Sequence, residues 1–160
     1  MYRRALSGLL LTFALAGLPA GEAWADAPVF VINQTQLPFD LGPGSPANAP
    51  TRQANLPTAA ANSAASPANS SAAYANSPHN PANSKRIIFD SDGTTLGYYA
   101  PNGSGTLNLF DMGGRRVAYR PRGTKSLFSN SGLWCGTVAS AQGGGMAFGI
   151  IRACAHLFFD

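Results

Sequence analysis

Hydrophobic and polar positions in this chain of 160 residues are segregated into blocks. An apolar stretch fills 5–20, and small and polar residues fill 45–86. Short apolar runs separated by glycine-rich turns begin at residue 87. Blocks of this kind predict segments of different physical character and exclude one ordinary enzyme domain that fills the whole chain. The boundaries predict four segments, which are 1–25, 26–44, 45–86 and 87–160.

The first segment has the features of an export signal. Two arginines precede the apolar stretch 5–20, which is shorter than the ~20 residues a membrane-spanning helix needs. Ala23-Trp24-Ala25 offers the small-x-small pattern that a signal peptidase reads, so we expect cleavage before Asp26. The mature protein is then periplasmic or secreted, and is not an integral membrane protein. A signal retained as a membrane anchor is the alternative.

The second segment, 26–44, contains one candidate strand. Its residues 29–32 form a compact run of apolar and largely β-branched side chains, Val-Phe-Val-Ile. This strand either pairs with the distant C-terminal domain or docks to a partner as an exposed peptide. Pairing is favoured, because an unpaired strand with several apolar side chains invites aggregation.

The third segment, 45–86, is a heptapeptide repeat with an Ala-Asn pair in every unit. No apolar residue recurs at two positions per unit, so the repeat lacks a coiled-coil seam, and its prolines interrupt any continuous helix. Ala, Asn, Ser and Pro offer too little apolar area to offset the entropy of ordering. We therefore expect a disordered, low-complexity linker, used either as a plain spacer or as a glycan-bearing stalk. The repeating asparagines are Asn48, Asn55, Asn62, Asn69, Asn76 and Asn83.

A second kind of repeat occupies the last segment, 87–160. Three units begin with Phe, reach Gly four residues later, and reach a small residue after four more. A degenerate fourth unit begins at Ala141. The repeated positions are Phe89, Gly93 and Gly97, then Phe110, Gly114 and Ala118, then Phe128, Gly132 and Gly136, and finally Gly145 and Gly149.

These units predict β-hairpins. Asp92-Gly93 favours a two-residue type I′ turn, which needs positive φ at both positions, and the glycine pairs ending at Gly114 and Gly145 satisfy the same need. The small residue inside each return strand is expected to allow close approach of another backbone or of an aromatic ring. A lone hairpin is unstable, so we expect a small, mainly β domain of about four hairpin units with pseudo-repeat symmetry, preceded by the disordered linker.

The turn motifs also carry a family resemblance. Phe-Asp-Ser-Asp-Gly at 89–93, followed by Gly97-Tyr98, and Phe-Asp-Met-Gly-Gly at 110–114, followed by Ala118-Tyr119, resemble the bacterial four-fold β-flower domains. The resemblance covers residues 87 to about 151 and implies four similar hairpins around a pseudo-four-fold axis. YD-type β-hairpin repeats of bacterial surface and toxin shells are more loosely similar. Neither resemblance implies an activity or a catalytic residue.

Charge adds one candidate surface. The formal net charge is +4, although only 11% of the residues are charged. Basic residues concentrate after the second hairpin turn. A solvated edge that prevents strand aggregation is the favoured interpretation. Contact with an anionic lipid or cell-wall surface is the alternative. Nucleic acid is not an expected partner, because the chain shows an export signal and no nucleic-acid module. The residues of this basic cluster are Arg115, Arg116, Arg120, Arg122 and Lys125.

The two cysteines, Cys135 and Cys154, add a candidate disulfide. An even cysteine count in a small exported domain favours a bridge, and two buried free thiols are the alternative. Other chemistry has little support. Asp-Ser-Asp-Gly at 90–93 begins like a calcium loop, but the twelfth position holds Pro101 instead of the required Glu. No metal, cofactor or catalytic residue is predicted.

These features together favour a function in binding. We expect an exported, non-enzymatic interaction module on a flexible tether, whose partner is an envelope protein or an anionic cell-wall or lipid surface. One alternative is a structural envelope protein that oligomerises through the apolar tail 146–159. The other is a minor enzyme or toxin-associated module with an anion site.

Overall fold

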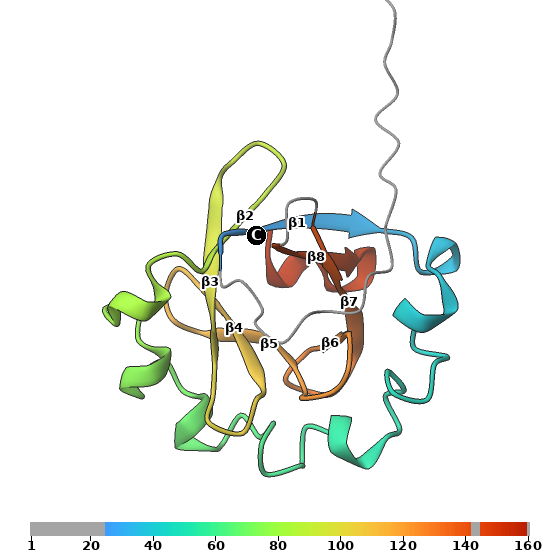
Figure 1. Cartoon of the computed structure of the whole chain (residues 1–160), viewed down its shortest axis with the longest axis horizontal. Coiled ribbons are helices and arrows are strands. Elements are labelled where there is room, and N and C mark those ends of the chain that lie inside the picture. The colour runs from blue at the N-terminus through green and yellow to red at the C-terminus, as the bar shows by residue number, and fades with distance from the viewer. Residues whose placement is uncertain (1–24, 142–144, 160) are drawn as a thin grey trace, which may run out of the picture.

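The computed structural model describes residues 25–141 and 145–159, and its strands form one closed eight-stranded barrel (Figure 1). The expected signal peptide lies outside the described residues, except for Ala25. The mainly β prediction is confirmed. The strands are β1 (Ala27–Ile32), β2 (Ile87–Phe89), β3 (Thr95–Pro101), β4 (Leu107–Asp111), β5 (Arg116–Arg120), β6 (Ser126–Phe128), β7 (Trp134–Ser140) and β8 (Met146–Ile151).

Strand β1 closes the barrel. Strands β2 to β8 pair with their neighbours in antiparallel order, whereas β1 lies between β2 and β8 and is parallel to both. Ala27 pairs with Ile88, and Val29 pairs with Phe148. The prediction that the run 29–32 forms a strand paired with the C-terminal domain is therefore confirmed.

Three hairpins, β2–β3, β4–β5 and β6–β7, have the same turn. In each, one glycine has a positive φ, which is 81° at Gly93, 82° at Gly114 and 86° at Gly132. A type I′ turn needs two successive positive φ values, but φ is not positive at Asp92 or Gly113, so the expected type I′ turns at Asp92-Gly93 and Gly113-Gly114 are wrong. One positive φ at the last turn position fits a type I turn followed by a glycine bulge. Strand β8 pairs with β7 to make the fourth hairpin. The resemblance to β-flower domains stays a prediction.

In the first three hairpins, the small residue of the return strand lies beside a shift in strand register. Ile88 pairs with Gly97 and Phe89 pairs with Thr95, so Leu96 is an extra, bulged residue. A Cβ on Gly97 would lie 1.9 Å from the Phe110 carbonyl oxygen. A Cβ on Gly136 would lie 1.8 Å from the Gly149 carbonyl oxygen. The prediction of close backbone approach is confirmed at both glycines.

Residues 45–86, here called the Asn belt, run around the outside of the barrel from β1 to β2 (Figure 1). The expectation of a disordered linker is wrong for this segment. Backbone bonds three residues apart fold it into successive tight turns, and each repeat asparagine is at most 2% exposed. The 3₁₀ turns of the belt are η3 (Gln53–Asn55), η4 (Pro67–Asn69), η5 (Tyr74–Asn76) and η6 (Pro81–Asn83), and two more, η1 (Gln34–Gln36) and η2 (Phe39–Leu41), lie between β1 and the belt.

Hydrogen bonds from the asparagine side-chain amides order the belt, which has too little apolar surface to be ordered by hydrophobic packing. Asn69 Nδ2 donates to the Ala61 and Ser63 carbonyl oxygens, at 3.0 and 2.9 Å. The same pair of bonds, to the residues eight and six positions earlier, recurs at Asn55, Asn62, Asn76 and Asn83. Each amide therefore ties its own unit to the previous one. A buried donor with two partners stabilises the fold, because leaving it unpaired would be costly.

The seven-residue repeat of the belt is in step with the hairpin repeat of the barrel. Tyr98 of β3 pairs with Phe110, and its hydroxyl donates to the Asn76 carbonyl oxygen at 2.9 Å. Tyr119 of β5 pairs with Phe128, and its hydroxyl donates to the Asn55 carbonyl oxygen at 2.9 Å. Three heptads of belt separate the two acceptors, and the same number of residues separates the two tyrosines. One hairpin of barrel therefore corresponds to three units of belt.

The C-terminal tail completes the core. The 3₁₀ segment η7 (Arg152–Leu157) follows β8 and joins the barrel through the Cys135–Cys154 disulfide, with Cα atoms 5.4 Å apart. The bridge expected from the cysteine count is thus confirmed. Cys135, Cys154 and Phe158 all belong to the main core cluster and are at most 8% exposed. The described part of the chain contains no helix that is both long and apolar enough to span a membrane.

We predict that Asn69→Asp lowers the free energy of unfolding by about 3 kcal/mol or more. The change keeps the acceptor that receives bonds from Asn102 and Asn108, but it removes two donors and places a carboxylate against two carbonyl oxygens. Urea unfolding at pH 7 measures the effect. Asn33→Asp, the same change at an exposed residue, is the control and should cost less than about 0.5 kcal/mol. Equal losses would contradict the role of the belt amides.

The double variant Cys135→Ala/Cys154→Ala should lose roughly 3 kcal/mol of stability, because the bridge closes a loop of moderate length in the unfolded chain. Thermal melting with and without a reducing agent measures the effect. Reductant should lower the melting temperature of the wild type and leave the double variant unchanged. Identical wild-type curves under both conditions would show that the bridge contributes nothing.

Candidate functional site

The residues of the predicted basic cluster differ in burial and in partners. Arg116 is 8% exposed, and its Nη1 donates to the Asn62 carbonyl oxygen at 2.7 Å while its guanidinium lies 4.6 Å from the Tyr119 ring centroid. Burial lowers the pKa of Arg116 to about 10. A side chain in this position holds the belt and is not available to an anionic surface. For Arg116, the predicted contact is therefore wrong.

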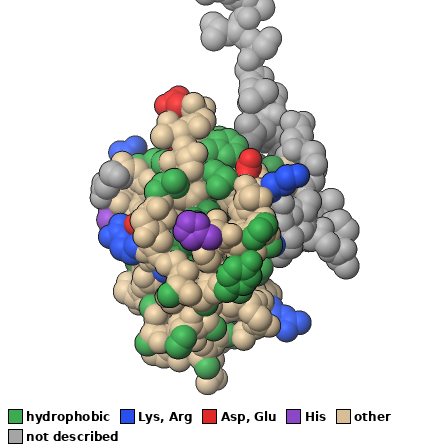
Figure 2. All heavy atoms as spheres, turned by 90° about the vertical axis from the view of Figure 1, so that its left-hand side faces the viewer, with side chains coloured by type: hydrophobic (Ala, Val, Ile, Leu, Met, Phe, Trp, Pro, Cys, Tyr) green, Lys and Arg blue, Asp and Glu red, His purple; other side chains and the backbone are tan. Residues whose placement is uncertain are grey.

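The other basic residues have separate surroundings. Arg115 pairs with Asp111 at 3.0 Å, and Lys125 pairs with Asp40 at 2.9 Å. Arg120 is half-buried, and Arg122 is exposed. On the face drawn in Figure 2, basic side chains lie at separate points. Burial of Arg116 and the ion pairs of Arg115 and Lys125 therefore reduce the positive charge that the five residues offer to an anionic surface.

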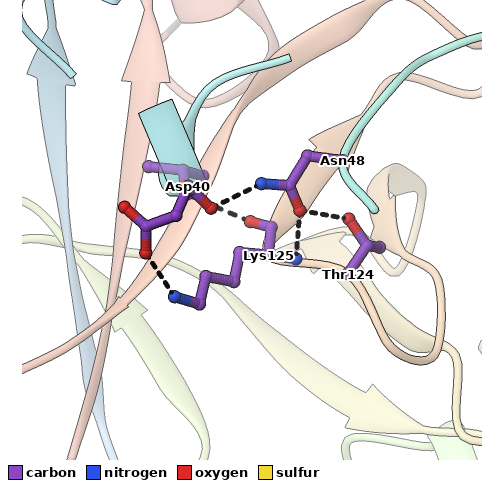
Figure 3. Close-up of polar contacts among 5 residues, drawn as sticks. Asp40, Asn48, Thr124 and Lys125 are labelled. Carbon is purple, nitrogen blue, oxygen red and sulfur yellow. Dashed lines mark hydrogen bonds and ion pairs between the residues drawn. The ribbon is translucent and has the colours of Figure 1, made fainter. Parts of the chain in front are cut away.

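Lys125 marks the place where the belt is first fastened to the barrel (Figure 3). Asn48 Nδ2 donates to the Asp40 carbonyl oxygen at 2.7 Å. Asn48 Oδ1 accepts from Thr124 Oγ1 at 2.8 Å and from the Lys125 backbone N–H at 2.9 Å. The ion pair between Lys125 and Asp40 therefore reinforces a network of hydrogen bonds. Its role here is structural.

A groove of about 550 Å³ lies where the first two hairpin turns meet the C-terminal tail. Hairpin β2–β3 contributes Thr94, Thr95 and Leu96 to one wall. The β4–β5 turn contributes Met112, which is 67% exposed, and the tail contributes Phe159, which is 39% exposed. Exposed large apolar side chains beside a concave surface are typical of an interaction site.

The groove also has polar groups, most of them engaged in the turns. Asp90 Oδ1 accepts from the backbone N–H groups of Asp92 and Thr94, both at 2.9 Å. Asp111 Oδ1 accepts from the Arg115 backbone N–H at 2.8 Å. His156 lines the tail side and is exposed. Over the described ranges, no three His, Cys, Asp or Glu side chains are grouped to hold a metal ion.

Sequence reasoning missed this groove. It assigned Asp92 and Gly93 to a turn and residues 146–159 to a core or an assembly tail, and it gave Met112 no role. The available signal was Met112 itself, an apolar residue at a turn position where the third hairpin has the polar Asn130. What no sequence pattern shows is that the tail folds back beside the first two turns.

Comparison with known proteins gives no relative on which to base a function. No family model matches the chain, and no curated protein or solved structure is significantly similar to it. Interpretation of the groove therefore depends on its own geometry.

The tyrosines under the belt generate a prediction for alkaline pH. Burial raises the pKa of Tyr98 to about 12, with Asp111 adding to the shift, and burial raises that of Tyr119 to about 12, with Arg116 opposing it. Unfolded tyrosines titrate near 10, so between pH 10 and 12 these two groups bind fewer protons in the unfolded chain than in the folded one. Arg116 opposes them, because its pKa is lowered in the folded chain, but it is one group against two. The free energy of unfolding should therefore fall as the pH rises through this window.

Denaturant unfolding from pH 9 to pH 12 measures this fall, and ultraviolet absorbance of tyrosinate follows the titration. Tyr98→Phe/Tyr119→Phe should remove the titration steps of these two residues near pH 12 and abolish the fall in stability that they cause in this window. A double variant with the same titration and the same pH dependence as the wild type would contradict the assignment.

Proposed function

We propose that this chain is an exported, non-enzymatic binding module that captures a protein partner in the groove between its first two hairpin turns and its tail. The observation that carries the proposal is the position of Met112 and Phe159, two exposed apolar side chains at one concave surface. A flexible methionine adapts to different apolar partners, which suits an interaction surface. The partner is expected to be an envelope protein.

Two further features support the proposal. The carboxylates of Asp90 and Asp111 already accept turn hydrogen bonds, so the groove has few groups free for catalysis. The Cys135–Cys154 disulfide is consistent with an oxidising extracellular compartment. Together with the export pattern in 1–25, it supports a periplasmic or secreted location. The belt is an ordered part of this domain, so residues 45–86 do not act as a flexible tether.

The test is capture of partners from envelope extract by the immobilised oxidised protein, followed by titration calorimetry with the purified partner. Met112→Glu should raise the dissociation constant at least tenfold, because it places a charge among the apolar contacts. Tyr74→Glu is the matched control, since Tyr74 is 70% exposed but lies on the belt away from the groove residues. It should leave the affinity unchanged.

Two outcomes would overturn the proposal. One is a partner that binds Met112→Glu as tightly as the wild type. The other is a partner lost equally from both variants, which would indicate nonspecific apolar capture. Binding to vesicles of anionic lipid that disappears in Arg115→Ala/Arg122→Ala, while Met112→Glu still binds them, would favour the anionic-surface hypothesis instead.

A further inference from the structure

The groove lies between the first and second hairpins, at the position equivalent to the one where a hydrogen bond joins the second and third hairpins. Between the second and third hairpins, Asn130 Nδ2 donates to the Arg116 carbonyl oxygen at 2.8 Å. Asn130 stands two residues after Phe128, at the turn position of the third hairpin. Arg116 is the first residue of the return strand of the second hairpin.

The same positions exist between the first and second hairpins. Met112 stands two residues after Phe110 and corresponds to Asn130, and Thr95 begins the return strand β3 and corresponds to Arg116. The register between hairpins is also the same, because Tyr98 pairs with Phe110 as Tyr119 pairs with Phe128. Both pairs bring aromatic rings together, with centroids 5.1 and 5.7 Å apart.

The two positions differ in chemistry. Met112 has no hydrogen to donate, so it does not provide the bond that Asn130 gives to Arg116. Thr95 and Met112 both line the groove. By the equivalence of the hairpins, the Thr95 carbonyl faces the place where an asparagine amide would lie. A backbone carbonyl in such a place favours a hydrogen-bond donor.

We infer that the groove recognises a partner segment that carries a carboxamide side chain, Asn or Gln, flanked by apolar residues. The amide donates to the Thr95 carbonyl oxygen as Asn130 donates to Arg116, and the apolar neighbours pack on Met112 and Phe159. The charged side chains of Asp90, Asp111 and Arg115 line the groove, and Arg115 pairs with Asp111. The remaining carboxylate, Asp90, adds negative potential, which complements an amide N–H₂ group and opposes a carboxylate. This inference rests on the proposed function and names the chemistry of its ligand.

Three short peptides test the inference. The probe is acetyl-Leu-Asn-Leu N-methylamide, whose only carboxamide N–H₂ is on the asparagine side chain, and the Asp and Lys versions are its controls. Backbone amide chemical shifts of the ¹⁵N-labelled oxidised protein report the binding. The Asn peptide should shift the signals of Thr95 and Met112, and the Asp peptide should bind at least about fivefold more weakly, since it lacks the donor. Equal affinities for the Asn peptide and either control would overturn the inference.

Two variants complete the experiment. Met112→Asn should fill the position from within the chain, as Asn130 does, and abolish binding of the Asn peptide while raising the melting temperature. Met112→Leu, which stays apolar and lacks a donor, should keep the binding. A Met112→Asn protein that binds the Asn peptide like the wild type would refute the equivalence. If Met112→Asn does not fold, the affinities of the Asn and Asp peptides for the wild type still decide whether the groove prefers a carboxamide.

The two proposals fail in different ways. Suppose that Met112→Glu weakens binding of the partner but that the three peptides bind with equal affinity. The groove would then remain a binding site, and only the carboxamide preference would be overturned. A partner unaffected by Met112→Glu would overturn the proposed function itself, whatever the peptides show.

Discussion

The structure depends on one interaction, in which the side-chain amide of a belt asparagine donates to two carbonyl oxygens of the preceding unit. This bond pair gives a sequence of Ala, Asn, Ser and Pro an internal order that its apolar area cannot supply. Three of the repeat asparagines also accept a hydrogen bond from the barrel through their side-chain oxygen: Asn48 from Thr124, Asn62 from Thr106 and Asn69 from Asn108. Asn62 and Asn69 therefore join belt to belt and belt to barrel at once, whereas the side-chain oxygens of Asn55 and Asn76 are buried without a hydrogen-bond partner among the described residues. The outward-facing tyrosines are buried only because this layer covers them.

The belt also decides which charged groups are available. Arg116 looks like a surface residue in the sequence, since it stands among other basic residues after a turn. In the structure it lies beneath the belt with its guanidinium over Tyr119, where it supports the fold. The groove, in contrast, presents the exposed apolar side chains of Met112 and Phe159 beside carboxylates that already accept hydrogen bonds. The recognition that we propose for the groove therefore depends on shape and hydrogen bonding more than on the net positive charge of the chain.

Local signals in the sequence were good guides to local structure. The glycine after each turn, the small residue at Gly97 or Gly136, the strand at 29–32 and the cysteine pair all have a short-range or pairwise physical cause, and each was predictable. The order of the belt was not, because composition argues for disorder while the decisive amide bonds need the tertiary path of the chain. The groove was missed for a related reason, since Phe159 and Met112 come together only when η7 folds back onto the barrel.

The position of β1 has a consequence for how the chain comes to be folded. Val29 pairs with Phe148, so β1 finds its main partner only when the chain as far as β8 is available. Closing such a loop costs conformational entropy before any contact compensates for it, so the barrel is expected to form late and slowly. A chain of this design remains open while its last strand is missing. It can therefore be threaded through a narrow passage as an extended polypeptide and acquire its closed form on the other side.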